Sequence, residues 1–178
     1  LKQSETTIEH YNHMEKVRDI AVLELLFGTG VRVSELCSLK YGDIGTGFSS
    51  VRVNGKGNKE RCIQIINKNI KKALQDYSFL FASKIECQDY FFVNRLGNRL
   101  SEQSVRLMVK KYRDMSHITK NITPHVFRHT FATLLLEHDV DIKYIQNLLG
   151  HSSIMTTQIY THVTTEKQTE ILTNKHPR

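Results

Sequence analysis

Residues suited to phosphate chemistry occur first in the segment 123–129. Pro124 favours the first turn of a helix, which places His125 and Arg128, three residues apart, on one face of that turn. Unpaired backbone N–H groups and the positive end of the helix dipole lie at the same place. Such a helix start binds phosphate, although His and Arg taken alone are more often ordinary surface residues.

The segment around Arg32 offers a second cation. Glycines at 28 and 30 end one predicted helix, Arg32 opens the next, and Glu35 follows three residues later. A carboxylate at this spacing holds a guanidinium in one rotamer, and a fixed guanidinium presents two parallel donors to a phosphate. A plain salt bridge within the helix would give the same pattern.

Two further segments carry a lysine and a histidine–tyrosine pair. Lys56 lies between two glycines at the expected tip of a hairpin, where its long side chain could deliver a proton to a leaving oxygen. His151 follows a glycine that is expected to cap a helix, and Tyr160 lies nine residues further on. Taken alone, Lys56 is most simply an exposed surface lysine, His151 a histidine without a function, and Tyr160 a half-buried packing residue. The combination of the four segments is what indicates chemistry.

The elements that must position these residues are mostly helices. Apolar residues recur at helical spacing, and helices are expected over 16–27, 33–40, 68–81, 101–116, from Pro124 onwards with Thr123 as cap, and over 142–149, 153–160 and 166–172. Two strands over 48–53 and 61–66 are joined through an Asn-Gly pair, a strong hairpin signal, and a short strand is expected over 90–93. The pattern predicts one α+β domain, mostly α-helical, with a small antiparallel β-sheet.

Composition limits the partner and the compartment. The 178 residues suffice for about one domain, and 25 Lys and Arg against 18 Asp and Glu leave a net charge of +7, which favours a polyanion such as nucleic acid. No apolar run approaches the length of a membrane span. Three widely spaced cysteines fit a reducing cytoplasm and no cysteine zinc site. The chain starts without Met or a signal peptide, as an excised fragment would.

Taken together, the four segments resemble the tyrosine recombinase family, the phage-integrase type of site-specific DNA recombinases. The matching segments are TGVRVSELCSL around Arg32, GKGNKER around Lys56, HVFRHTFATLLL around His125 and Arg128, and LLGHSSIMTTQIYTHV around His151 and Tyr160. The resemblance covers about residues 15–163, and the order of the six residues is highly specific. It implies the catalytic domain alone, without the separate N-terminal core-binding domain of the family.

The resemblance also implies roles for these residues. Tyr160 would attack a DNA phosphodiester and form a 3′-phosphotyrosyl bond, releasing a 5′-hydroxyl, without metal, ATP or another cofactor. Lys56 would protonate the leaving oxygen, and His125 would assist removal of the proton from Tyr160, whose ordinary pKa near 10 makes it a poor nucleophile. The residues that would bind the charged phosphate oxygens are Arg32, Arg128 and His151. Glu35 would orient Arg32 without touching DNA.

Basic residues outside these segments would then contact the DNA backbone and make the affinity depend steeply on salt. The residues expected to do so are Arg52, Lys59, Arg61, Arg99, Arg106 and Lys110; a solvated helix face would carry similar charge. His129 is expected to pack within the helices. The partners implied are double-stranded DNA and further copies of the chain in a homo-tetramer, with residues 164–178 docking on a neighbour, a monomer in isolation, and a bacterial cytoplasmic location.

Three other functions are weighed against this one. The predicted helices 142–149 and 153–160 imitate a helix-turn-helix, as in a DNA-binding module without catalysis. His125 and His129, four residues apart, could hold a metal in a hydrolase, but Val126 stands where a zincin carries its catalytic Glu. A type IB topoisomerase shares much of the implied chemistry.

Overall fold

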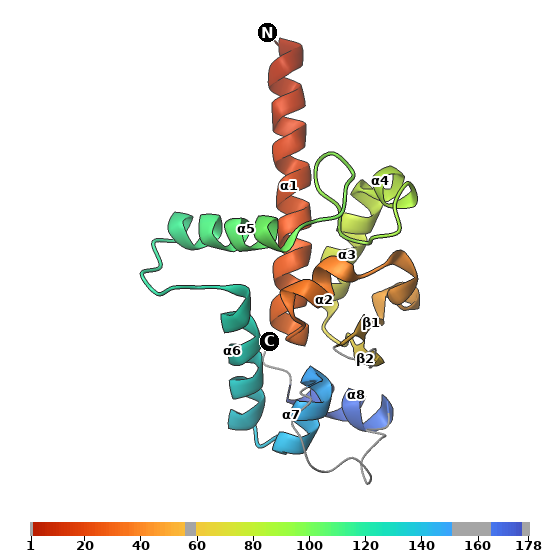
Figure 1. The fold of residues 1–178 in the computed structure, drawn as a ribbon, viewed down its shortest axis with the longest axis vertical. Coiled ribbons are helices and arrows are strands. Elements are labelled where there is room, and N and C mark those ends of the chain that lie inside the picture. The colour runs from red at the N-terminus through yellow and green to blue at the C-terminus, as the bar shows by residue number, and fades with distance from the viewer. Residues whose placement is uncertain (1, 56–59, 151–164, 176–178) are drawn as a thin grey trace.

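A long helix, α1 (Lys2–Thr29), forms the axis of the molecule, and the other elements pack around its C-terminal half (Figure 1). The computed structural model of the protein describes residues 2–55, 60–150 and 165–175. The other helical elements are α2 (Val33–Ser38), η1 (Tyr41–Asp43), η2 (Thr46–Phe48), α3 (Lys68–Leu80), α4 (Ala82–Glu86), α5 (Glu102–Met115), α6 (Pro124–Glu137), α7 (Ile142–Leu149) and α8 (Thr165–Asn174).

One antiparallel hairpin makes up the sheet. Strands β1 (Ser50–Asn54) and β2 (Glu60–Gln64) pair so that Val51 lies opposite Ile63 and Val53 opposite Arg61. This confirms the predicted fold class, mostly α-helical with a small antiparallel sheet.

The strand predicted over 90–93 is wrong as a paired strand. The structure has only isolated bridges there, from Lys40 to Tyr90 and from Val93 to Arg99. The hydroxyl of buried Tyr77 takes up the intervening backbone, since it donates to the carbonyl of Phe91 and accepts from the N–H of Val93, both at 2.9 Å. A side chain therefore satisfies groups that a neighbouring strand would otherwise bond.

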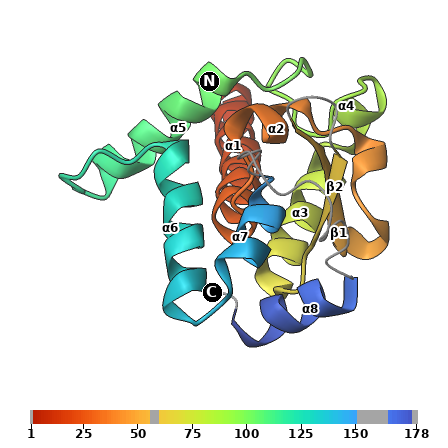
Figure 2. The same ribbon diagram turned by 60° about the horizontal axis from the view of Figure 1, so that its bottom comes forward.

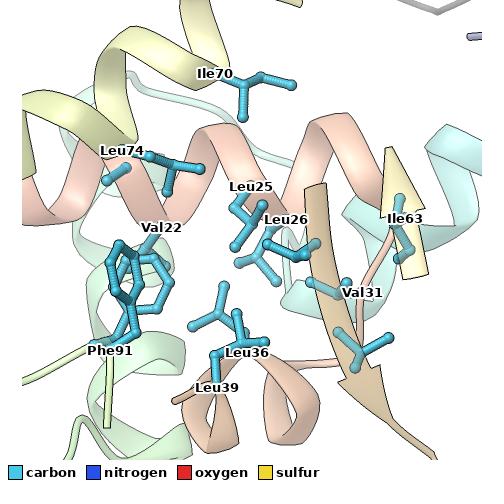
Figure 3. Packing of buried hydrophobic residues seen from close by; sticks show 14 of the residues in the cluster. Val22, Leu25, Leu26, Val31, Leu36, Leu39, Ile63, Ile70, Leu74 and Phe91 are labelled. Carbon is cyan, nitrogen blue, oxygen red and sulfur yellow. The ribbon is translucent and has the colours of Figure 1, made fainter. Parts of the chain in front are cut away.

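The hydrophobic core lies between α1, α3, α2 and the hairpin. Val22, Leu25 and Leu26 of α1 are fully buried. Figure 3 shows them between Ile70 and Leu74 of α3 on one side and Leu36 and Leu39 on the other. Since α1 is surrounded on several sides here, it is apolar over most of its circumference in this stretch, as a central helix must be. This packing fixes the position of the C-terminal end of α1. The loop that follows α1 carries Arg32.

Helix α1 begins at Lys2 and not at residue 16 as predicted, and α4 was not predicted. The start of α6 and the end of α7 agree with the predictions. Helix α6 begins at Pro124, although the preceding Thr123, in extended conformation, makes no side-chain capping bond within the described part of the chain. Helix α7 ends at Gly150, which takes the left-handed conformation with φ of 65°, as a C-cap glycine does. The helix predicted over 153–160 lies outside the described residues.

Helix α8 packs against the hairpin of its own chain, as Figure 2 shows at the foot of β2. Its Leu172 is 1% exposed and belongs to the core. The same helix was expected to dock on a neighbouring protomer, and in this single chain its buried leucine already has an intramolecular partner.

Candidate active site

Arg128 holds together three elements of the fold at the C-terminal end of α7. From α6, its Nη1 donates to the carbonyl of Gly30 and its Nη2 to the carbonyl of Leu149, both at 2.6 Å. The last carbonyls of a helix lack intrahelical partners and carry partial negative charge, so a cation is well placed there. A guanidinium has five N–H donors, and two bonds to carbonyls do not exhaust it.

Arg32 reaches the same helix end from the other side. It precedes α2, and its Nη2 lies 3.3 Å from the carbonyl of Gly150. Gly150 is the residue directly before His151, so Arg32 contacts the chain at the point where it leads into that histidine. About a third of the Arg32 side chain is exposed, which leaves it accessible to a ligand.

Glu35 is the buried anion of the cluster. It accepts from Nη1 of Arg32 at 2.8 Å and from the backbone N–H of Arg32 at 2.8 Å, the second contact being that of a capping glutamate at N3. It also accepts two parallel bonds from Arg61, each 2.9 Å long. The carboxylate therefore bonds Arg32 as the sequence suggested, and a second arginine that was not expected there.

The charged groups of this cluster change one another's pKa values. Burial would raise the pKa of Glu35, but the hydrogen bonds from Arg61 and from the Arg32 backbone, together with the charge of Arg61, bring it below its ordinary value. Burial first, and then repulsion from Arg32, lower the pKa of Arg128 to about 10, against the attraction of Glu35. Both groups are charged at neutral pH, and the two arginines are close enough to repel.

Arg61 lies in this cluster and not on the open surface where it was expected. Its side chain is 13% exposed, its Nε donates to the carbonyl of Leu148 at 2.8 Å, and its remaining nitrogens bind Glu35. The sequence pattern contained the signal, because Arg61 and Ile63 share one face of β2, Ile65 follows directly after the strand, and Ile63 and Ile65 are both buried. Period-two alternation places Arg61 inward.

His125 lies on the first turn of α6, one turn before Arg128, and is exposed. His129 is exposed as well, so the expectation that it packs between helices is wrong; the buried face of α6 passes through Arg128, Phe131 and Leu135. Lys56, His151 and Tyr160 lie outside the described residues.

The other residues expected to contact DNA differ in how far their side chains are engaged within the protein. Arg52 on β1 and Lys110 on α5 are exposed. Arg106 pairs with Glu102 at 2.7 Å one turn away. Arg99 donates to the carbonyl of Cys37 and to Ser38 Oγ, both at 2.8 Å, and its guanidinium lies over the ring of Tyr90. Lys59 is outside the described residues.

Across the described segments, no three His, Cys, Asp or Glu residues gather closely enough to hold a metal ion. Nor does any helix in that part of the chain have the length and apolar character needed to cross a membrane.

Gly30 is expected to tolerate no side chain. A Cβ there would lie 2.7 Å from Phe131 Cδ1 and 2.8 Å from Leu149 Cδ2, at a φ of +62°. Backbone strain of this kind costs about 1–3 kcal/mol, so Gly30→Ala should lower the melting temperature by roughly 2–12 °C. Gly42→Ala is the matched control, because a Cβ at Gly42 meets nothing within 4 Å. Equal melting temperatures in calorimetry would contradict this packing.

Removing the charge of Glu35 should destabilise the protein in a pH-dependent way. Because its pKa is lowered on folding, its contribution is complete above the ordinary carboxyl pKa and is lost as the pH falls through the lowered value. Glu35→Gln should cost about 3 kcal/mol of unfolding free energy near pH 7, and the difference from wild type should shrink in acid. Urea unfolding at several pH values measures it.

Glu102→Gln is the control for that series. Glu102 also pairs with an arginine, but 38% of its side chain is exposed, and exposed pairs contribute about 0–1 kcal/mol. A Glu35→Gln cost as small as that of Glu102→Gln, or one that grows in acid, would show that the buried carboxylate does not act as described.

The comparisons with known proteins agree with this geometry. The model of the phage integrase family matches residues 2–167. A tyrosine recombinase of Agathobacter rectalis is 51% identical over 177 residues, which cover 99% of this chain and 58% of the relative. The chain thus spans a little over half the length of that curated relative.

Two solved structures share the fold. The structure of XerA recombinase superposes with a TM-score of 0.71 at 36% identity, over 96% of this chain and 64% of that one. The XerH site-specific recombinase bound to its difH substrate in a pre-cleavage complex gives 0.70 at 25% identity, over 89% and 48%. With a family match over nearly the whole chain and a relative at 51% identity, the protein belongs to the phage integrase family of tyrosine recombinases.

Proposed function

We propose that this chain is the catalytic domain of a site-specific DNA recombinase, which cuts and rejoins strands through a 3′-phosphotyrosyl bond to Tyr160. The observation that supports it most is that Arg32 and Arg128, far apart in sequence, both bond carbonyls at the C-terminal end of α7, directly before His151 in the sequence. Burial and the charge of Arg32 lower the pKa of Arg128. Two cations held this close are stabilised when an anion binds, and guanidinium groups match phosphate geometry.

In the proposed reaction the phenol oxygen of Tyr160 attacks the scissile phosphorus, and the bond from phosphorus to the 5′-oxygen breaks. His125 accepts the phenol proton, and Lys56 donates a proton to the leaving 5′-oxygen. The 5′-hydroxyl of another strand then attacks the phosphotyrosine and restores a DNA phosphodiester. Since one phosphate ester replaces another at each step, no ATP and no other cofactor is required.

The transition state carries extra negative charge on the non-bridging oxygens. Arg32, Arg128 and His151 would neutralise it, as fixed donors do in an oxyanion hole. Arg128 is held from behind by the carbonyls of Gly30 and Leu149, so its remaining donors need no reorganisation when charge develops. Such preorganised donors are each worth about a hundred- to a thousandfold in rate.

The proposed substrate is double-stranded DNA, in a homo-tetramer formed on it. The exposed basic side chains of Arg52, Arg106 and Lys110 would contact its backbone, whereas Arg99 is held mainly by its own chain. Lys59, outside the described residues, is proposed as a further backbone contact. XerH, bound to its difH substrate, supports a DNA partner. For the setting we propose DNA integration and recombination of a mobile element in a bacterial cytoplasm; strict resolution of repeated sites on one circle, without integration, would contradict that setting.

The experiment that tests the function uses a duplex with the parent element's end sequence, nicked so that the short leaving strand diffuses away. The chain is incubated with it at low salt in the presence of a chelator, and binding is confirmed by fluorescence anisotropy. Mass spectrometry should then find a DNA adduct on the peptide that contains Tyr160. Bound DNA without adduct would favour the non-catalytic helix-turn-helix module.

The remaining alternatives give other results in the same assay. A metal hydrolase would cut only after divalent metal is restored and would leave no adduct. A type IB topoisomerase would relax supercoiled plasmid that lacks the target sequence.

A further inference from the structure

We infer that Arg61 is a positioning residue of the recombination reaction, which places Arg32 through Glu35 and holds the chain that leads into His151. This inference rests on the proposed function and deepens it. Arg61 stands on β2, five residues after Lys56 in the sequence. It is not one of the groups proposed to bind the phosphate.

The first part of the inference is the contact with Glu35. Arg61 donates two parallel bonds of 2.9 Å to the carboxylate, and Arg32 donates to the same carboxylate at 2.8 Å from its side chain. One anion is thus shared between two cations. Without Arg61, both oxygens of Glu35 would be free to attract Arg32, and its guanidinium would be drawn back from the phosphate position.

The second part is the contact with the end of α7. The Nε of Arg61 donates to the carbonyl of Leu148 at 2.8 Å. A Cβ on Gly150 would lie 2.8 Å from Arg61 Nη1 and 3.2 Å from its Cζ, so the guanidinium is packed directly on this glycine. Gly150 immediately precedes His151 in the sequence, so the guanidinium packs on the last described residue before that histidine.

Only an arginine can make these contacts together. A guanidinium donates to a carboxylate through one edge and has Nε left for a carbonyl, whereas an ammonium is a point charge without this fork. The side chain is 13% exposed, and its nitrogens are engaged within the protein. Contact with DNA phosphate would require it to leave Glu35.

The test compares Arg61→Met and Arg61→Lys with wild type in single-turnover cleavage of the nicked duplex, at protein concentrations that saturate binding. We expect the cleavage rate to fall about 10- to 100-fold in both, the size of effect that a misplaced group has on a reaction. DNA affinity should stay within about twofold, since the phosphate contacts are elsewhere. Lys16→Met, on the exposed face of α1, controls for the loss of one positive charge.

A second readout separates positioning from general loss of structure. A scissile methylphosphonate has a methyl group in place of one non-bridging oxygen and carries no charge, so it depends less on well-placed cations. If Arg61 acts through Arg32, the deficit of both variants relative to wild type should be at least about fivefold smaller on this substrate, because less charge has to be neutralised. A merely weakened fold would slow both substrates alike.

The possible outcomes distinguish failure of the positioning role of Arg61 from failure of the proposed function. Variants that cleave at the wild-type rate, or that lose affinity while keeping the rate, overturn the positioning role and leave the proposed function intact. Wild-type chain that binds the duplex without forming an adduct overturns the proposed function itself. If Arg61→Met does not fold, Arg61→Lys keeps the buried charge and decides alone. When an Arg61 variant is combined with Glu35→Gln, the two losses of cleavage rate should not add, because both substitutions act through the Glu35 carboxylate.

Discussion

Replacing Tyr160 by Phe is expected to abolish the covalent adduct with DNA while leaving DNA affinity within about twofold. The substitution removes one oxygen and keeps the aromatic ring, so packing and charge are conserved. Loss of the nucleophile removes the covalent route itself and not one contribution to its rate, and we expect adduct formation to fall by at least roughly a thousandfold. Gel mobility under denaturing conditions and mass spectrometry measure the adduct.

The matched control for this variant is Tyr144→Phe. Tyr144 lies on α7, close in sequence to the proposed site, and is partly buried against the core. The same atom is removed in both variants, so only the position differs. Adduct at the wild-type level in Tyr160→Phe would place the nucleophile on another residue, and the peptide that carries the DNA would identify it.

Arg128→Lys is expected to slow cleavage by about a hundred- to a thousandfold. Lysine keeps the charge but cannot bond the carbonyls of Gly30 and Leu149 and also present parallel donors to a phosphate. Both carbonyls lose bonds of 2.6 Å, so the melting temperature should fall as well. Since the pKa of Arg128 is about 10, the wild-type rate should show no step from this group between pH 6 and 9 and should fall as the pH rises past 10.

Arg18→Lys separates the loss of stability from the loss of catalysis. Arg18 is also a largely buried arginine, paired with Asp19 at 2.7 Å, but it lies about three turns before the end of α1. It should reduce the melting temperature without a comparable loss of cleavage rate. If Arg128→Lys and Arg18→Lys reduce cleavage equally, Arg128 serves the fold and does not bind phosphate.

Features that depend on neighbours along the chain could be predicted from the amino-acid sequence. The start of α6 at Pro124, the end of α7 at Gly150 and the hairpin around residue 55 follow from local conformational preferences. The bond between Arg32 and Glu35 follows from their spacing of three residues. The order of the four segments indicated the family, and the comparisons confirm it.

Contacts between groups from distant segments could not be predicted in this way, because they depend on how the elements pack. Strand alternation places Arg61 inward, but only the tertiary structure supplies its partners, because its buried guanidinium must be hydrogen-bonded and Glu35 and the carbonyl of Leu148 lie beside it. Tyr77 likewise takes the backbone bonds expected of a strand over 90–93. Local patterns specify helices, turns and neighbouring pairs, but a buried polar group takes its partner from whatever element the folded core brings beside it.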